Sequence, residues 1–596
     1  MANAARKRKR QFAPKTKTGC RTCKRRHLKC GEEWPECSNC LSARLFCAGY
    51  GIWGGGTLGG EHGRNNGIAT RPATEPAPPV LVTAPALSRH HTPMPFKDIT
   101  PAEQMCFDYF VNKTVAKIPG VFPSNFWTEL VLQASASELP IMHAAVALGS
   151  AHRSADLNRY GSSVPSSFSC YRENGKFDPH EAFALEQYNK SISQLRQNKF
   201  EEENVKEVRT ALVACILYVS LELLRGDYST AVTHTRHGLN LLRRLKRGFD
   251  PRVFYPRRLH DSVDDYLIEA FTRLSLQSAH AGSIQAICDV AHSQSLSSEW
   301  DLPHVFADMF EARRAFDSLR HLILSLTEQC RRLEANGQQP SEEIFAQHRL
   351  LQKAMSTWLR TFTASVPTLH RVTSCRHSLG IPLIRLLHTM ASIQVATMFS
   401  TSEACYDDFT SAFTFILSEI VAVYRRASEF HNRPFTNDVR LTGFSFTLDV
   451  GTIPLLSYVA LKCRVPWLRR QAIAILLAAP HREGIWDGVV IAHNAERVMI
   501  LEENGFFDQF ALDLDPRPFD PLAEKNERYL AHIPSLPAVS RFRHVKIIPS
   551  RASTARGKLI CWRQNPDCSQ GWEEVVEDFD LTAVHQAESD GVEFPC

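Results

Sequence analysis

The sequence predicts a mainly α-helical protein with a small cysteine-rich module at its N-terminus. From about Thr100 onward, apolar residues recur at steps of three and four for some 400 residues, the period of buried helix faces. Ahead of this region, six of the 17 cysteines lie between residues 20 and 47. Nine glycines in residues 49–67 and seven prolines in residues 72–95 separate the two parts. At 596 residues, the chain is long enough for two or more folded regions.

Charge is concentrated at the N-terminus. The first fifty residues hold 13 lysines and arginines against three glutamates, whereas the net charge of the whole chain is only +6. A compact basic head on a nearly neutral body is typical of a nucleic-acid-binding module joined to a larger domain. The long apolar stretch that starts at Ala211 contains Glu222, and it is shorter than the roughly 20 residues of a membrane-spanning helix. We therefore expect no membrane partner.

A basic segment, residues 1–17, precedes the cysteines. It has no apolar core behind its charges, so it does not resemble a secretory signal, and we expect the protein to stay inside the cell. The segment contains a run of five cations: Arg6, Lys7, Arg8, Lys9 and Arg10. Such a run predicts binding to a nuclear import receptor and location in the nucleus. The alternative is a solvated tail.

The six cysteines follow the pattern C-x2-C-x6-C-x6-C-x2-C-x6-C within residues 18–50. They are Cys20, Cys23, Cys30, Cys37, Cys40 and Cys47. One tetrahedral zinc would use four thiolates, whereas two zinc ions need eight bonds, which six sulfurs supply if two of them bridge. The count predicts a binuclear cluster with two zinc ions per chain. The alternative is a pair of redox CxxC motifs or disulfides. It does not explain six regularly spaced cysteines flanked by basic residues.

The segment resembles the fungal binuclear-zinc-cluster DNA-binding domain, through the basic stretch KRRHLK after the second cysteine and Pro35 before the fourth. The resemblance implies that Cys20 and Cys37 bridge the metals. It also implies that the helix between Cys23 and Cys30 enters the major groove of double-stranded DNA and reads a short GC-rich, CGG-like triplet. The DNA-binding residues would be Arg21, Lys24, Arg25, Arg26, His27 and Lys29, with Arg26 and His27 at the bases.

Residues 51–97 read as a Gly/Pro-rich linker, flexible at first and then extended. The linker composition excludes a coiled coil, so a homodimer would have to form through the helical domain. That domain, residues 98–535, begins with Thr100 as the N-cap and Pro101 in the first turn. Residues 208–224 carry one apolar face and end at Gly226, and residues 230–245 follow as the second helix of an αα-hairpin. Similar periodicity recurs at residues 383–390, 455–463 and 472–477.

The body is similar to the second type of fungal-specific transcription-factor domain. Three stretches carry the likeness: ELPIMHAAVALGSAHR, LELLRGDYSTAVTHTRHGLNLLRRL and PLLSYVALKCRVPWLRRQAIAILLAAPHREGIWDG. The resemblance implies a regulatory domain in a sequence-specific transcription factor of RNA polymerase II genes, with transcriptional co-regulators as further candidate partners. Regulators of metabolism, drug resistance and secondary-metabolite genes are all found in this family.

The C-terminal extension, residues 536–596, predicts two short strands, HVKIIPSR and KLICWRQNP, followed by an acidic tail. Acids stand beside apolar residues in the tail, so it resembles an activation segment, and an exposed amphipathic helix is an equally good interpretation. The acids are Glu573, Glu574, Glu577, Asp578 and Asp580.

The sequence predicts no enzyme, because it holds no phosphate-binding glycine loop, no GxSxG and no GxGxxG. The rival hypothesis is an enzymatic or small-molecule-binding helical domain with the zinc cluster as an accessory. Four helical histidines, His143, His152, His234 and His237, lack the spacing of metal ligands and are interpreted as ordinary helix residues.

Overall fold

The computed structural model describes most of the chain from Ile99 onward and a few residues of the cysteine-rich module. The described residues are Cys23, Arg26, Leu28, 38–43, 99–157, 179–197, 204–245, 263–280, 302–373, 375–430, 446–478, 481–510, 512, 533–549, 556–565 and 571–581. The predicted basic segment and the predicted linker lie outside them. Helices predominate in the described part, which confirms the mainly α prediction.

The helical domain begins where the sequence predicts. Helix α3 (Pro101–Tyr109) is capped by Thr100, whose hydroxyl accepts a hydrogen bond from the backbone N–H of Glu103 at 3.3 Å. The Glu103 carboxylate in turn accepts from the Thr100 N–H at 2.9 Å, so two end groups of the helix are satisfied reciprocally. The chain then passes through short elements that the sequence did not predict: the π-helical turns η1 (Phe110–Thr114) and η2 (Phe126–Leu130) with α4 (Val115–Lys117) and α5 (Val131–Ser135).

Helix α6 (Leu139–Leu157) lies at the centre of the first half of the domain, and α7 (Pro179–Gln197) packs along it. Almost all of α6 from Pro140 to Ala155 is buried, so its composition is apolar or small on every side. Gly149 lets α3 cross α6 closely, because a Cβ at this position would lie 2.3 Å from the carbonyl oxygen of Cys106.

The predicted αα-hairpin is formed by α8 (Val205–Arg225) and α9 (Tyr228–Leu245). Gly226 ends α8 in the left-handed conformation at φ 84°, which glycine adopts without a Cβ penalty. The predicted second helix, residues 230–245, corresponds to α9. The sequence predicts that only one face of α8 is buried, and this underestimates its burial. Residues 212–224 are buried on all sides of the helix.

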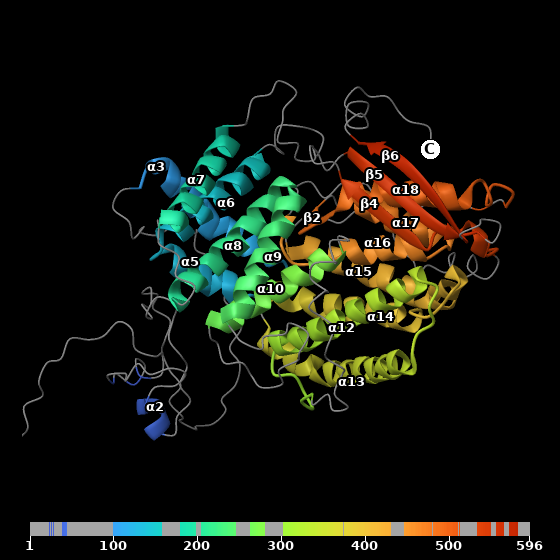
Figure 1. Cartoon of the computed structure of the whole chain (residues 1–596), viewed down its shortest axis with the longest axis horizontal. Coiled ribbons are helices and arrows are strands. Elements are labelled where there is room, and N and C mark those ends of the chain that lie inside the picture. Colours follow the sequence, from blue (N-terminus) through green and yellow to red (C-terminus); the bar gives the residue numbers. More distant parts are fainter. Residues whose placement is uncertain are drawn as a thin grey trace, which may run out of the picture.

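The rest of the domain is built from further helices, of which α10 packs into the first half and the others form the second half. They are α10 (Val263–His280), α12 (Met309–Ala335), α13 (Glu342–Val372), α14 (Gly380–Ala396), α15 (Thr410–Phe430), α16 (Ile453–Lys462), α17 (Pro466–Ala478) and α18 (Gly488–Glu503), with 3₁₀ turns η3 (Cys375–Leu379) and η4 (Glu403–Phe409). Figure 1 shows α12, α13, α14 and α15 stacked in layers, with α13 at the lower edge. The predicted periodic segments 383–390, 455–463 and 472–477 fall in or at the end of α14, α16 and α17.

One described segment, His377–Ala396, is long and apolar enough to cross a membrane by length and composition alone. Its most apolar stretch is 67% buried inside the protein, and α14 within it packs against α12, α13 and α15. We therefore interpret α14 as a core helix.

A small sheet joins the two halves and was not predicted. Strand β1 (Phe446–Thr447) pairs in parallel with β2 (Arg482–Glu483), which pairs in antiparallel fashion with β3 (Trp486–Asp487). The chain after β1 returns to the first half, where the N–H of Leu448 donates to the carbonyl of Ile118 at 2.8 Å. Each strand holds only two residues, too few for an alternating pattern to be visible in the sequence.

The C-terminal extension forms a three-stranded antiparallel sheet after the turn η5 (Ala538–Ser540). Its strands are β4 (His544–Pro549), β5 (Arg556–Gln564) and β6 (Trp572–Asp580). The two predicted strands are confirmed as β4 and β5. The interpretation of the acidic tail is wrong for residues 572–580, which form neither a helix nor a detached activation segment but the edge strand β6. The rest of the tail lies outside the described residues.

Three acids of β6 form ion pairs with arginines on β5 and α18. Glu573 pairs with Arg563 on β5, Asp580 pairs with Arg556, and Glu577 reaches Arg497 on α18. The face of the sheet that carries Glu577 packs on α18, through a small apolar cluster that includes Val498 and Leu559.

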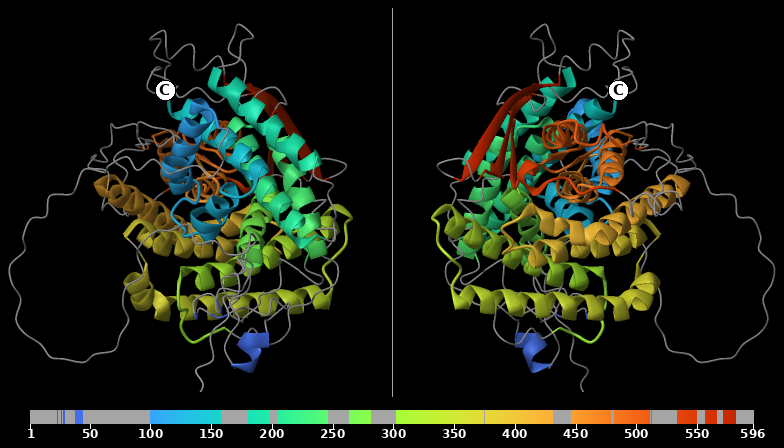
Figure 2. Two further views of the ribbon diagram at one scale, coloured as in Figure 1. Left: turned by 90° about the vertical axis from the view of Figure 1, so that its left-hand side faces the viewer. Right: turned by 90° about the vertical axis from the view of Figure 1, so that its right-hand side faces the viewer.

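Two apolar cores hold the helices together. The first joins α3 to α10 and takes in Phe446 of β1, and the second joins α12 to α18. In both views of Figure 2 the two sets of helices pack into one body, with the C-terminal sheet on its outside.

Candidate nucleic-acid interface

The described residues of the cysteine-rich module place a buried thiol beside an exposed cation. Cys23 is fully buried, whereas Arg26 is exposed three residues later. The N–H of Leu28 donates to the carbonyl of Cys23 at 2.9 Å, which ties these two described residues together. A buried sulfur suits a metal ligand, and an exposed guanidinium suits a DNA contact.

A short helix, α2 (Ser38–Ser42), lies in the second half of the cysteine pattern and contains Cys40. Cys40 holds the place in the second half of the pattern that Cys23 holds in the first. Both halves of the sequence pattern therefore carry a cysteine in helical conformation.

Most of the predicted interface lies outside the described residues. This applies to the zinc ligands Cys20, Cys30, Cys37 and Cys47, to the side chain of Cys40, to the DNA-binding residues Arg21, Lys24, Arg25, His27 and Lys29, and to the nuclear-localisation residues Arg6, Lys7, Arg8, Lys9 and Arg10. Their roles remain predictions. In the part of the chain that the structure describes, no group of three or more histidine, cysteine or acidic side chains is arranged to hold a metal.

Three of the four helical histidines make structural hydrogen bonds. A ring nitrogen of His143 lies 2.7 Å from the Gln187 side chain, His152 lies 2.9 Å from Thr114, and His234 lies 2.8 Å from the Tyr188 hydroxyl. These contacts join neighbouring helices of the first core. They support the interpretation of these three side chains as ordinary helix residues.

A buried ionic cluster lies where the two cores meet. It was not predicted from the sequence. Arg313 on α12 contacts Asp317 at 3.0 Å and Asp449 at 3.1 Å, and Arg273 on α10 contacts Asp449 at 3.1 Å. Burial lowers the pKa of Arg313, but the two aspartates outweigh it, so its pKa is raised and the guanidinium stays charged. The guanidinium also stacks over Phe122, 4.1 Å from the ring centroid. The cluster therefore fastens α10, α12 and the β1 loop together.

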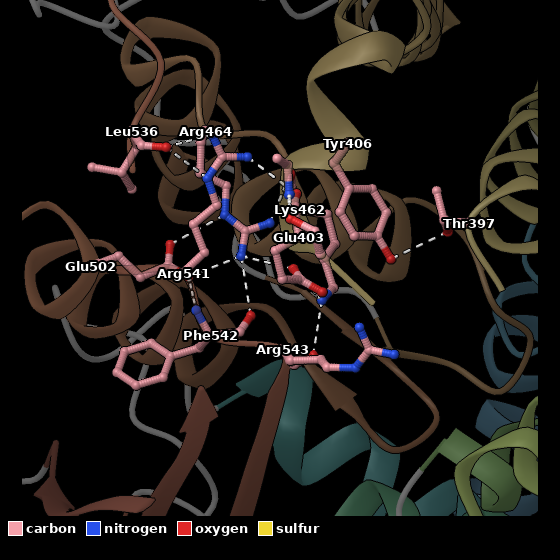
Figure 3. A network of polar contacts seen from close by, with 12 residues as sticks. Thr397, Glu403, Tyr406, Lys462, Arg464, Glu502, Leu536, Arg541, Phe542 and Arg543 are labelled. Carbon is pink, nitrogen blue, oxygen red and sulfur yellow. Dashed lines mark hydrogen bonds and ion pairs between the residues drawn. The ribbon is translucent and has the colours of Figure 1, made fainter. Parts of the chain in front are cut away.

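A second buried network, shown in Figure 3, centres on Glu502 of α18. Its carboxylate contacts Arg464 at 2.9 Å and Arg469 at 2.5 Å, and accepts the N–H of Phe542 at 2.6 Å. Burial raises the pKa of Glu502, but the charges of Arg464 and Arg469 outweigh it and lower the pKa to about 2. The carboxylate is thus held ionised inside the protein.

The same network fixes the start of the C-terminal extension on the helical domain. Arg541 donates to Asp407 at 2.8 Å and to the carbonyl of Leu536 at 2.6 Å. Lys462 bridges Glu403 and the carbonyl of Arg543, at 2.9 Å each (Figure 3). The residues that lead into β4 are therefore bound to α16, α18 and η4, so we infer that the C-terminal sheet is an integral part of the domain.

A small cavity lies between α8, α9 and α10. Its lining is mostly apolar, with Thr235 and Gln277 as the polar residues, and its space is about that of one water molecule. A cavity of this size is too small for a metabolite-sized effector.

Comparison with known protein families now identifies both parts of the chain. The model of the fungal Zn(2)-Cys(6) binuclear cluster domain matches residues 18–52, and that of the fungal specific transcription factor domain matches residues 105–403, about half of the chain. The chain belongs to the fungal specific transcription factor domain family and carries the zinc-cluster DNA-binding domain. Both resemblances inferred from the sequence are confirmed.

The curated relatives are fungal transcription regulators. The aspercryptin biosynthesis cluster-specific transcription regulator atnN of Emericella nidulans is 28% identical over 254 residues, which cover 39% of this chain and 36% of that protein. The transcription regulator lscL of Purpureocillium lilacinum is 23% identical over 36% of this chain and 46% of its own. The ustiloxin B cluster transcription factor ustR of Aspergillus flavus is 51% identical over 39 residues, 6% of this chain and 7% of its own. The matches thus span less than half the length of these relatives. No solved structure matches the chain.

Proposed function

We propose that this protein is a sequence-specific DNA-binding transcription factor of RNA polymerase II genes that reads a short GC-rich, CGG-like triplet. The observation that carries the proposal is the six-cysteine segment, which has the spacing of the binuclear-cluster family over residues 18–52. The buried Cys23 and the exposed Arg26 support it, because they are the environments that a zinc ligand and a DNA contact require.

Six thiolates would hold two zinc ions: those of Cys20, Cys23, Cys30, Cys37, Cys40 and Cys47. Bound zinc would cross-link a module too small to bury a core of its own. Within the module, Arg26 and His27 would contact base edges, whereas Arg21, Lys24 and Lys29 would contact phosphates. Arginine suits the first role because it can donate two hydrogen bonds to one guanine.

The helical domain would regulate transcription in the nucleus, which the protein would reach through an import receptor bound to residues 6–10. We further propose that the target genes form a biosynthetic cluster. The relatives atnN and ustR are named as regulators of such clusters, and this supports the proposal over general metabolic or drug-resistance genes.

Selection of duplexes from a random pool by the zinc-loaded full chain tests the proposal. We expect enrichment of a CGG-like triplet, and we expect Cys23→Ser to abolish it. Genome-wide mapping of bound sites in the native organism then tests the target class. If the zinc-loaded wild type enriches no sequence, the proposed function is wrong. If the bound sites in the genome lie away from biosynthetic genes, the proposed target class is wrong.

A further inference from the structure

Helix α13 carries an unusually one-sided set of charges. It is 31 residues long, and its only acids are Glu342 and Glu343 in the first turn. The 29 residues that follow hold no acid at all. Four cations in this part are exposed to solvent: Arg349, Lys353, Arg360 and Arg371.

These four cations, which we name the α13 stripe, lie on one face of the helix. At 100° per residue, their positions fall within an arc of about 40°. With a rise of 1.5 Å per residue, they extend over about 33 Å of helix. Pro367 is the one proline inside α13, and it precedes only the last of them.

The opposite face of α13 is buried. Trp358 and Phe362 are fully or almost fully buried, and the indole N–H of Trp358 donates to the carbonyl of Ala312 on α12 at 3.1 Å. Figures 1 and 2 show α13 as the outermost helical layer along the lower edge of the domain. The α13 stripe therefore points away from the protein.

Most of the stripe has no carboxylate partner among the described residues. Arg349 contacts Glu342 at 2.6 Å, at the N-terminal end of the stripe. Among the described residues, Arg360 donates only to the Thr357 hydroxyl, and Arg371 donates only to groups in its own last turn. Lys353 makes no ion pair within the described residues. Three cations in a row are thus available to an external anion.

The residues between the cations indicate what kind of anion fits. The exposed positions there include Gln352, Ser356 and Thr363, and no phenylalanine, tyrosine or tryptophan is among them. A protein partner would need a buried apolar or aromatic anchor at the centre of its interface. DNA phosphates are bound by arginine and lysine together with small polar side chains. The length of the stripe also matches one turn of B-DNA, about 34 Å.

We propose that the α13 stripe is a second, sequence-independent DNA contact that binds the phosphate backbone beside the site held by the zinc module. This inference rests on the proposed function, because the zinc module must first bring a duplex to the protein. The covalent connection between module and helical domain then keeps flanking DNA at a high local concentration near the stripe, so weak phosphate contacts add to the overall affinity.

The test compares two triple variants of the zinc-loaded full chain. Lys353→Gln, Arg360→Gln and Arg371→Gln together neutralise the three cations of the stripe that have no carboxylate partner among the described residues. The matched control combines Lys113→Gln, Lys546→Gln and Lys558→Gln, three exposed cations on other elements, with the same loss of charge. Affinity is measured against salt concentration on a long duplex with flanks, and on a duplex of about 12 base pairs that covers little more than one helical turn.

On the long duplex, we expect the slope of log affinity against log salt to become shallower by about 2 to 3 in the stripe variant, since each lost phosphate contact removes about 0.9. The control should keep the slope of the wild type, and all three proteins should bind the short duplex alike. Equal slopes for the stripe variant and the wild type would overturn the inference. Equal slopes with reduced transcription in cells would instead assign the stripe to an acidic protein. Failure of the wild type to prefer any site would overturn the proposed function itself.

Discussion

Arg26 and Lys24 carry the same charge but are expected to act differently on DNA. Arg26 is exposed, and its planar guanidinium can bind guanine O6 and N7 together, whereas the Lys24 ammonium is a point charge suited to a phosphate. We expect Arg26→Ala to cost about 1 to 3 kcal/mol on the selected site and to relax base preference there. Lys24→Ala should weaken binding to all sequences alike. Titrations on matched and scrambled sites check this, and equal losses for both variants would contradict it.

Glu502 is the residue on which the Figure 3 network depends. Its replacement by glutamine leaves Arg464 and Arg469 buried without their shared counter-charge. Breaking a buried pair in this way costs about 3 to 5 kcal/mol, so we expect Glu502→Gln to lower the free energy of unfolding by that amount. Urea unfolding measures it. Glu496→Gln is the control, because Glu496 lies on the same helix with a side chain that is 46% exposed, and it should change little.

The same carboxylate gives the protein a pH-dependent stability at low pH. The pKa of Glu502 is about 2 in the folded protein, against an ordinary value of 4.5, so unfolding raises it and the unfolded chain binds more protons. The contribution of Glu502 to stability is complete above pH 4.5 and is lost as the pH falls from 4.5 toward 2. We expect Glu502→Gln to flatten the decline of stability in this window. An unchanged decline in pH-dependent urea unfolding would show that Glu502 is not the source.

At the scale of helices, Gly238 decides how closely α9 packs. A Cβ at this position would lie 2.3 Å from the Phe271 ring on α10 and 2.8 Å from the Cys215 sulfur on α8. Alanine improves helix propensity by about 1 kcal/mol, but overpacking costs about 1 to 3 kcal/mol, so the packing cost should prevail. We expect Gly238→Ala to destabilise the helical domain in thermal unfolding. Asn240→Ala, at an exposed position of the same helix, is the control and should be close to neutral.

The helix boundaries that the sequence predicts are those set by local chemistry. Thr100 with Glu103 starts α3, and Gly226 ends α8, because each signal acts within one turn of the chain. Strand β6 was not identified as a strand from the sequence, because its role depends on pairing with β5. Taken alone, the mixture of acids and apolar residues in this segment fits a tail or an amphipathic helix. Only the pairing of Glu573 with Arg563, and of Glu577 with Arg497, places these acids on a sheet.

The buried ionic clusters were beyond prediction for a related reason. Arg313 and Asp449 are 136 residues apart, and Arg464 and Glu502 are 38 apart, so nothing in a local window links them. A charged residue within a helical pattern is normally read as part of the exposed face. Arg313 and Arg469 are instead almost fully buried, which only the tertiary fold reveals.

For the whole molecule, the cysteine spacing alone was sufficient to predict the zinc module, and the family comparison confirms it. The spacing is informative because zinc coordination fixes ligand type and number regardless of the remaining fold. The individual roles of Arg26 and His27 come from the resemblance and remain predictions. The α13 stripe was missed because its cations are 4, 7 and 11 residues apart, and their alignment emerges only on one long helix.

Zinc content is the first prediction at this scale. Six thiolates complete two tetrahedra only by sharing, so we expect two zinc ions per full chain in elemental analysis. Cys20→Ala should lower zinc content and DNA binding more than Cys47→Ala, because a bridging sulfur serves both metals. A stable ratio of one zinc per chain would contradict the binuclear assignment, and equal effects of the two variants would contradict the bridging role of Cys20.

The last prediction concerns how two chains would share one DNA site. Residues 49–95 hold nine glycines and seven prolines, which lower helix propensity by about 1 kcal/mol per glycine and 3 per proline, so we expect no coiled coil there. We predict that any homodimer forms through the helical domain beyond Thr100, with each zinc module on its own tether. Half-site spacing should then have little effect on affinity, because the tethers adjust.

Gel-shift titrations of the full chain on paired CGG-like half-sites, separated by increasing numbers of base pairs, measure this directly. Sedimentation of the zinc-loaded chain without DNA gives the oligomeric state, and a single half-site is the control for monomer binding. We expect affinity to vary gradually across the spacings. A sharp optimum at one spacing would show instead that the residues next to the zinc module hold the two modules in a fixed arrangement, and the dimer contact would have to be sought there.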